Sequence, residues 1–366
     1  MPKKIIIIGA GPVGCYTAQI LKTYGLNPTI IEEHNEVGRP LHCTGLVGSR
    51  LFAEKRSVAI PDSAIINSIN GAVIHYNGQS FPIRRKNVAY VVDRERFDKD
   101  LSRGLNIIYG KRFLGLETAG SQYVIETDHG EFRADMVIAA DGANSLMRNI
   151  ISGNDRLEQC KGVQMRIMFK SRRKDMVEVF LKPSSFMWIV PETADIARVG
   201  TISENPYNDL QDFFKKKKIK GEILEKFGGL VTIGICNRSV KDNLVIVGDA
   251  ACQLKPLTYG GLYFGLKSAA ILASCIKNNR LNQYDQFWRK ELESEISIGL
   301  KIRKVYNKLD GEELSTVFSL LKDHKSLVEK IGDFENHSRL LLEIVKKPAL
   351  YPRIGSLFRI LFKTIF

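Results

Sequence analysis

The sequence predicts an α/β fold that combines a parallel sheet, an inserted antiparallel sheet and a helical C-terminal part. Three observations support this prediction. Residues 5–32 have the pattern of a strand, a helix and a second strand, which is typical of a parallel βαβ unit. Buried-strand patterns return at residues 136–140 and 244–247. Between these segments, residues 65–92 and 161–203 alternate apolar and polar side chains, as antiparallel strands do.

The opening segment predicts its elements clearly. Residues 5–8 are four isoleucines, whose β-branched side chains favour a buried strand. Residues 12–24 begin with a proline, which suits the first turn of a helix, and residues 28–32 return to a strand. The charge-free stretch 5–21 is interrupted by three glycines and a proline, so we expect neither a signal peptide nor a membrane-spanning helix there.

The middle of the chain predicts mainly strands. Residues 65–92 contain Asn-Gly pairs at 70–71 and 77–78, and both pairs predict hairpin turns. The C-terminal part has helical spacing over residues 282–347. Further expected elements are helices at 93–103, 207–218 and 262–276, and strands within 105–140.

These patterns predict a discontinuous organisation. A Rossmann-like nucleotide-binding domain is interrupted by an antiparallel-sheet domain that binds the substrate, and a helical region follows both. The expected division is residues 1–55, 85–155 and 238–280 for the first domain, 56–84 and 156–237 for the sheet domain, and 281–366 for the helical region.

A glycine-rich motif, GAGPVG, lies directly between the first strand and the first helix. Gly9 permits a tight turn, Gly11 lets the backbone approach a pyrophosphate, and Gly14 permits close packing of the helix on the sheet. Glu32 follows at the end of the second strand, where an acidic residue accepts a hydrogen bond from a ribose hydroxyl. The motif therefore predicts a dinucleotide site for FAD or NAD, and the acidic residue disfavours a 2′-phosphate.

Two later segments add groups to this site. Asp141 and Asp249 each end a predicted strand, where a carboxylate can accept a hydrogen bond from a ribityl hydroxyl. Gly260 and Gly261 open a predicted helix, whose N-terminus can stabilise negative charge on a reduced flavin.

The composition limits the classes of partner. The 366 residues carry a formal net charge of +14, which favours polyanionic partners such as phosphorylated substrates or anionic lipid surfaces. We find no nucleic-acid recognition module and no His/Cys cluster with metal-ligand spacing, so neither nucleic acid nor a metal is expected. The six cysteines form no CxxC pair, which favours a reduced intracellular protein.

The motifs together resemble those of a known group of flavoproteins. GAGPVG with Glu32, Asp93-Arg94 before Phe97-Asp98, ADGANS and VGDAA occur in the order found in the group that contains para-hydroxybenzoate hydroxylase. The resemblance spans residues 3–280 and implies FAD as the cofactor. It implies FAD contacts from Gly9, Gly11, Gly14, Glu32, Arg94 and Asp249, and the expected cofactor-binding set also includes Glu33, Cys43, Thr44, Asp141, Gly260 and Gly261.

Two further segments resemble the geranylgeranyl reductase family within this group. KPSSFMWIVPE, residues 182–192, resembles its P-x-x-Y-x-W-x-F-P signature, with phenylalanine at 186 in place of the tyrosine and valine at 190 in place of the phenylalanine. VGRPLHCTGLVG, residues 37–48, resembles its cysteine-bearing loop. The resemblance implies that reduced FAD saturates carbon–carbon double bonds of isoprenoid chains, often on membrane-lipid precursors. In this sequence Cys252 and Tyr259 stand where the group commonly has glycine.

The residues near these motifs suggest a substrate site. In a strand, Phe186, Trp188 and Val190 would face one side, where they can line a channel for an isoprenoid chain. Plain core packing of this strand is the alternative. Cys43 is the candidate catalytic residue, controlling the proton or the approach of the substrate; a packed, chemically silent thiol is an equal alternative.

Three functions follow as hypotheses. The leading one is an FAD-dependent prenyl reductase that takes electrons from NAD(P)H, a deazaflavin or a ferredoxin. The alternatives are an FAD-dependent aromatic monooxygenase and a non-catalytic flavoprotein that binds lipid. A basic amphipathic pattern at residues 354–365, and the lysines within 215–220, can bind an anionic membrane surface, so we expect a cytoplasmic protein that is peripheral on the inner face of the cell membrane.

Overall fold

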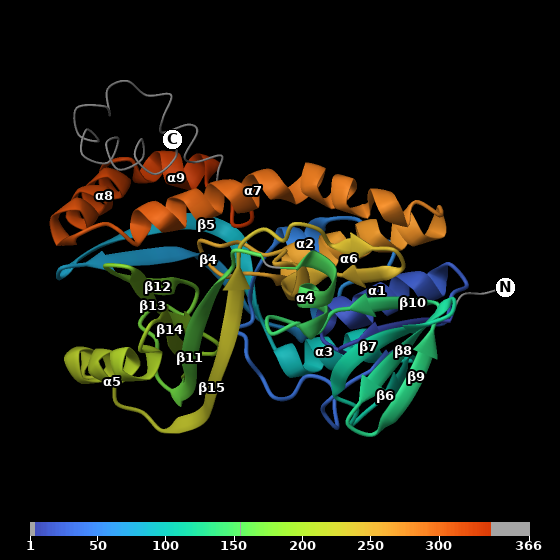
Figure 1. The fold of residues 1–366 in the computed structure, drawn as a ribbon. Coiled ribbons are helices and arrows are strands. Elements are labelled where there is room, and N and C mark those ends of the chain that lie inside the picture. The colour runs from blue at the N-terminus through green and yellow to red at the C-terminus, as the bar shows by residue number, and fades with distance from the viewer. Residues whose placement is uncertain (1–3, 154, 338–366) are drawn as a thin grey trace.

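A parallel sheet and a larger, mainly antiparallel sheet lie beside each other under a cover of C-terminal helices (Figure 1). The computed structural model describes residues 4–153 and 155–337. The expected helical segment 338–347 and the amphipathic segment 354–365 lie outside the described residues. No helix within the described ranges combines the length and the apolar character needed to cross a bilayer.

The parallel sheet brings together strands from three distant parts of the chain. The predicted return of residues 136–140 and 244–247 to this sheet is confirmed, because β10 pairs in parallel with β1 and with β17. The strands run in the order β16 (Val240–Lys241), β17 (Leu244–Ile246), β10 (Met136–Ala139), β1 (Ile5–Ile8), β2 (Thr29–Ile31) and β6 (Asn106–Ile108), with β16 antiparallel at the edge.

The four isoleucines of β1 are buried on both faces of this sheet. Ile5 and Ile7 pack into the core formed with α1 (Pro12–Thr23) and α6 (Leu262–Lys277). Ile6 and Ile8 pack on the opposite side, against a core formed by α4 and the small sheet. The elements of this side are α4 (Leu146–Ser152), β7 (Phe113–Ala119), β8 (Gln122–Thr127) and β9 (Gly130–Ala134).

The larger sheet has eight strands within the described part of the chain. Their order is β15 (Ile223–Ile233), β11 (Glu158–Met168), β14 (Ile196–Ser203), β13 (Ser185–Pro191), β12 (Val177–Lys182), β4 (Ile65–Tyr76), β5 (Gln79–Val92) and β3 (Leu46–Gly48). The expected domain boundary at residue 85 lies inside β5, and β3 of the first segment pairs with β5. The two halves of the molecule therefore share strands around this edge.

One predicted turn is wrong. Asn77-Gly78 forms the turn of the β4–β5 hairpin, but Asn70-Gly71 lies inside β4. There the register between the strands shifts, and Gly71 has a φ of 139°. A glycine in a strand can mark a bulge as well as a turn, and local sequence does not distinguish them.

The large sheet buries its two faces differently. Met187 and Ile189 point to one face, where they pack with Leu210 and Phe213 of α5 (Pro206–Lys217). The other face is turned toward the half that holds the parallel sheet. Above both halves runs α7 (Tyr284–Tyr306), followed by α8 (Gly311–Asp323) and α9 (Lys325–Ile331) (Figure 1). The remaining short elements are α2 (Arg50–Ala53), α3 (Arg94–Ser102), η1 (Asp62–Ala64), η2 (Gly248–Ala251) and η3 (Leu281–Gln283).

Candidate active site

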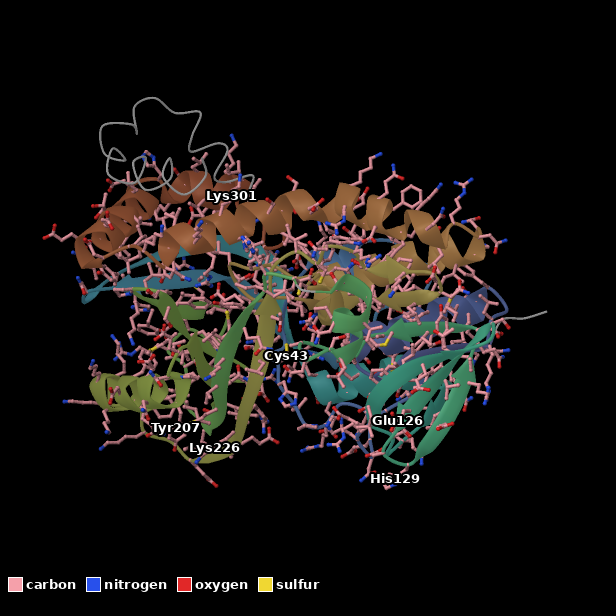
Figure 2. All side chains as sticks on the ribbon, in the orientation of Figure 1. Cys43, Glu126, His129, Tyr207, Lys226 and Lys301 are labelled. Carbon is pink, nitrogen blue, oxygen red and sulfur yellow. The ribbon has the colours of Figure 1, made fainter. Side chains whose placement is uncertain are left out.

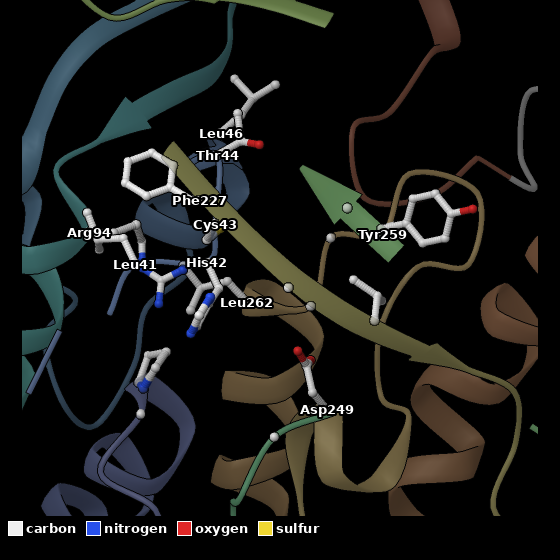
Figure 3. A pocket seen from close by; sticks show the side chains of 18 of the residues that line it. Leu41, His42, Cys43, Thr44, Leu46, Arg94, Phe227, Asp249, Tyr259 and Leu262 are labelled. Atoms are coloured by element: carbon white, nitrogen blue, oxygen red, sulfur yellow. The ribbon is translucent and has the colours of Figure 1, made fainter. Parts of the chain in front are cut away.

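A cavity of about 1070 Å³ lies between the carboxyl ends of the parallel strands and the inner face of the large sheet. Every expected cofactor-binding residue except Gly14 lines it, and so do Phe186, Trp188 and Val190. Cys43 lies in the middle of the molecule, between the two halves (Figure 2). Figure 3 shows Arg94, His42 and Cys43 together on one side of this cavity, with Asp249 and Tyr259 elsewhere on its wall.

The three motif glycines have different structural roles. Gly9 has a φ of +96°, and a Cβ there would lie 2.6 Å from the Ala140 carbonyl oxygen. A Cβ on Gly14 would lie 2.1 Å from the Gly9 carbonyl oxygen, so this glycine serves the packing of α1 on the turn. A Cβ on Gly11 would meet no protein atom within 4 Å. Gly11 therefore borders open space at the N-terminus of α1, where a pyrophosphate fits.

Glu32 is held in place at the end of β2. Its carboxylate accepts hydrogen bonds from the backbone N–H of Ala10 at 2.6 Å and of His34 at 3.0 Å. The ring Nδ1 of His34 lies 2.6 Å from the same carboxylate. Glu32 is buried while its neighbour Glu33 is exposed, and both line the cavity. A fixed carboxylate with remaining lone pairs is suited to a ribose hydroxyl.

Two half-buried aspartates complete the cofactor end. The Oδ1 atom of Asp141 is buried without a hydrogen-bond partner, which a ligand hydroxyl could supply. Burial raises the pKa of Asp249, although the nearby Arg94 and Arg148 oppose the shift. A Cβ on Gly261 would lie 2.3 Å from Asp249 Oδ1, so only glycine lets this helix start approach the carboxylate. Three features of this end of the cavity fit FAD. They are the open space at Gly11, the unpartnered Oδ1 of Asp141 and the absence of a side chain at Gly261.

Replacing Asp249 with asparagine is expected to weaken FAD binding by about 10-fold to 100-fold, because a charged acceptor is lost. The same change should stabilise the apoprotein by about 1–3 kcal/mol at neutral pH, because a buried charge is removed. The raised pKa means that the folded state binds the proton more tightly, so this stabilisation should shrink as the pH falls through that pKa. Thermal unfolding of both apoproteins across mildly acidic and neutral pH checks this. A constant difference would contradict it.

The loop that carries Cys43 is tied to both halves of the molecule. The Cys43 sulfur accepts a hydrogen bond from the Gly45 N–H at 3.3 Å and lies near Arg94 (Figure 3). Arg94 itself makes an ion pair with Asp98, with N–O distances of 2.9 and 3.1 Å. The Thr44 carbonyl accepts a hydrogen bond from Arg198 at 2.6 Å. Cys43 therefore sits in a fixed, half-buried position on the cavity wall.

An ion-pair network holds this loop, and the sequence did not reveal it. Arg198 donates to Glu192 at 2.9 Å, and Arg166 forms a two-pronged contact with the same carboxylate. Burial raises the pKa of Glu192, but the two guanidinium groups outweigh burial and lower it overall. All three residues lie in or next to strands of the large sheet. The available signal was a charged residue within each of two strands, at 166 and 198, and one directly after a strand, at 192.

The signature strand presents alternate residues to the cavity. Phe186, Trp188 and Val190 of β13 line it, whereas the residues between them pack under α5. A Cβ on Gly200, the cross-strand neighbour of Trp188, would lie 2.5 Å from the indole. The indole N–H donates to Gln164 Oε1 at 3.1 Å. Because Gly200 has no side chain, the Trp188 indole fits beside it without a clash.

Cys252 and Tyr259 both adopt left-handed backbone conformations. Their φ angles are +54° and +60°, a region that glycine adopts without strain. This gives a physical reason why the flavoprotein group commonly has glycine at these two positions. Tyr259 stacks with the guanidinium of Arg303 at 4.5 Å from its ring centroid. Its ring also faces Phe186, with centroids 6.4 Å apart.

A buried ion pair closes the cavity on the side of the C-terminal helices. Lys255 Nζ lies 2.8 Å from Glu335 Oε2 and donates to the Phe334 carbonyl at 2.7 Å. The two charged side chains are only 4% and 2% exposed. Phe334 and His337 line the cavity beside this pair. Burial and the Lys255 ammonium lower the pKa of His337 to about 3, so its ring is neutral at physiological pH.

Over residues 4–153 and 155–337, no group of three or more His, Cys, Asp or Glu side chains is arranged to hold a metal ion.

Comparisons with known proteins agree with this geometry. The model of the FAD binding domain family matches residues 3–40. A protein of uncharacterised function from Methanocaldococcus jannaschii is 32% identical over 98% of this chain and 97% of its own length. Digeranylgeranylglycerophospholipid reductase from Methanococcus aeolicus is 28% identical over 86% of this chain and 88% of its own.

Solved structures share the fold. A geranylgeranyl bacteriochlorophyll reductase-like protein from Thermoplasma acidophilum superposes with a TM-score of 0.79 at 22% identity, over 98% of this chain and 99% of that chain. A single-substitution variant of Klebsiella pneumoniae HpxO complexed with FAD superposes with a TM-score of 0.68 at 14% identity, over 90% of this chain and 97% of that chain. The expected fold class and the expected cofactor, FAD, are confirmed. The chain belongs to one family with the Methanocaldococcus jannaschii protein, and this family consists of FAD-dependent oxidoreductases related to the geranylgeranyl reductases.

Proposed function

We propose that this protein is an FAD-dependent prenyl reductase that saturates carbon–carbon double bonds of isoprenoid chains on membrane-lipid precursors. One observation carries the proposal: a single cavity connects the dinucleotide cradle with an apolar face of the large sheet. The names of the relatives, digeranylgeranylglycerophospholipid reductases, supply the substrate class.

The apolar side chains of this face form a continuous row that runs across the strands of the large sheet. Trp188 is paired with Val179 of β12, and Val179 is paired with Ile74 of β4. All three line the cavity, together with Ile83 of β5. From β11 to β5 the strand order contains five spacings, or roughly 24 Å at ~4.8 Å each. An extended prenyl chain fits along such a row, and its burial excludes water.

The division of chemistry follows from this arrangement. Bound reduced FAD supplies a hydride, and the alkene also needs a proton. An isolated alkene accepts hydride poorly, so the dry wall formed by Trp188 and Val190 has the task of keeping solvent out and the chain aligned. We propose that Cys43 Sγ, on the fixed loop between the two halves, controls the proton or the approach of the chain. Arg94 and the Gly45 N–H would hold that sulfur in position.

The protein would meet its substrate at an anionic lipid surface. The lysines at 215–218 lie at the end of α5 or directly after it, all exposed, and Tyr207 on the same helix is 50% exposed. Tyr207 and Lys226 lie together along the lower edge of the molecule (Figure 2). Basic side chains next to an exposed aromatic ring suit a bilayer with anionic headgroups. The electron donor would be NAD(P)H, a deazaflavin or a ferredoxin.

Anaerobic incubation of the chemically reduced protein with a geranylgeranyl lipid is expected to add one H₂ per double bond reduced, measured by mass spectrometry. Trp188→Leu should keep bound FAD and lose at least about tenfold in turnover, because the prenyl chain of the substrate loses an aromatic contact surface. The ratio of flavin absorbance to protein absorbance is the control for cofactor loading. Addition of oxygen to an aromatic substrate in air would favour a monooxygenase instead. A flavoprotein that binds the lipid without changing its mass would contradict the proposal.

A further inference from the structure

Two side chains that line the cavity, among those the structure describes, bury a polar atom without a hydrogen-bond partner. They are Asp141, through Oδ1, and Gln164, through Nε2. Asp141 lies at the FAD end, so the cofactor accounts for it. Gln164 lies on β11 in the large sheet and is 6% exposed. Its amino group needs another explanation.

The orientation of the Gln164 amide is fixed by Trp188. An indole N–H can only donate, so the oxygen of the amide must face it, as observed at 3.1 Å. The amino group is thereby turned away from Trp188 with its hydrogens unused. The residues paired with Gln164 on the neighbouring strands, Gly200 and Phe227, have no polar side chain to accept them. Among residues 4–153 and 155–337, no group accepts a hydrogen bond from this amino group.

A buried donor without an acceptor costs about 1–3 kcal/mol, and a ligand oxygen would remove that cost. The hydrocarbon part of a prenyl chain has no hydrogen-bond acceptor. In a prenyl lipid, the one oxygen close to an alkene is bonded to the first carbon of the prenyl chain. That carbon is allylic to the first double bond. We infer that Gln164 binds this allylic oxygen and so holds the adjacent double bond in register for reduction, an inference that rests on the proposed function.

The surroundings of Gln164 suit this direction of binding. A second cavity, of about 390 Å³, shares Arg39, Leu41 and Phe227 with the main one, and Lys226 and Glu225 add one basic and one acidic side chain to its lining. Phe227 is the residue of β15 paired with Gln164. An anionic headgroup beyond the allylic oxygen would therefore reach basic side chains on the β15 side. The hydrocarbon chain would lie the other way, across β13, β12 and β4.

The test is the position of the first double bond saturated in a single turnover of a geranylgeranyl ether lipid, determined by NMR and fragment masses. The wild-type protein should reduce the allylic bond first. Gln164→Met should lower the preference for that bond over the distal bonds by about tenfold, the value of one hydrogen bond. Gln159→Met is the matched control: Gln159 is exposed on the same strand and does not line the cavity, so the allylic preference should persist.

A second measurement uses the unaltered protein, so it does not depend on the folding of a variant. A geranylgeranyl hydrocarbon without the oxygen should be reduced by wild type without allylic preference. Three results for Gln164→Met overturn the inference. The first is an unchanged preference for the allylic bond. The second is an equal slowing at every double bond, which would mean that the amide binds a water, and the third is a changed flavin spectrum, which would mean that the amide binds the cofactor. Failure of wild type to reduce any prenyl chain instead refutes the proposed function itself.

Discussion

Replacement of Gly11 by valine is expected to give a folded protein that purifies without FAD. The backbone at Gly11, with φ −65° and ψ 174°, is accessible to any residue, and a Cβ there meets no protein atom. The added side chain would instead occupy the open space at the N-terminus of α1. We expect FAD affinity to fall more than about 100-fold, because the backbone can no longer approach the pyrophosphate. Titration of the apoprotein with FAD, followed by flavin fluorescence, measures this.

Gly14→Ala is the matched contrast, three residues along the same motif. Its Cβ would lie 2.1 Å from a backbone oxygen, which cannot move as the end of a flexible side chain can. We therefore expect this variant to lose stability as apoprotein, by about 1–3 kcal/mol or more, as overpacked sites do. The apoprotein of Gly11→Val should unfold near the wild-type temperature. Tight FAD binding by Gly11→Val would show that the pyrophosphate lies elsewhere.

The second large effect concerns the ion pair between Lys255 and Glu335. Lys255→Met should lower the free energy of unfolding by about 3–5 kcal/mol, because it leaves a carboxylate that is 2% exposed without its counter-charge. Glu335→Gln should be costly for the same reason. The double variant should recover most of the loss, since neither charge then remains buried alone. Denaturant unfolding of the four proteins gives the coupling energy.

An exposed ion pair supplies the control for this cycle. Arg103, whose side chain is 82% exposed, pairs with Asp100 at 2.8 Å. Arg103→Met should change stability by less than about 1 kcal/mol, because solvent screens that pair. If the double variant lost as much as the two single variants together, Lys255 and Glu335 would not act as a pair.

Sequence reasoning succeeded where the determinants are close together in the chain. The cradle formed by Gly9, Gly11 and Gly14 depends on one strand, one turn and one helix, all within residues 5–23. The placement of Trp188 on the cavity face depends only on the alternation of side chains along β13. The prediction of a hairpin turn failed at Asn70-Gly71, because the same local residues can form a bulge or a turn.

The sequence by itself determined the parallel-sheet core, the glycine-rich turn between β1 and α1, and the face of the signature strand, because short-range periodicity and backbone sterics specify these. Only the tertiary structure decided that Gln164 meets Trp188, that Arg198 holds the Thr44 carbonyl, and that Lys255 is paired with Glu335. These partners are 24, 154 and 80 residues apart. Their meeting depends on strand order and on how the C-terminal helices close over the sheet. Local periodicity carries no information about either, because the same pattern of apolar residues is compatible with several orders of strands.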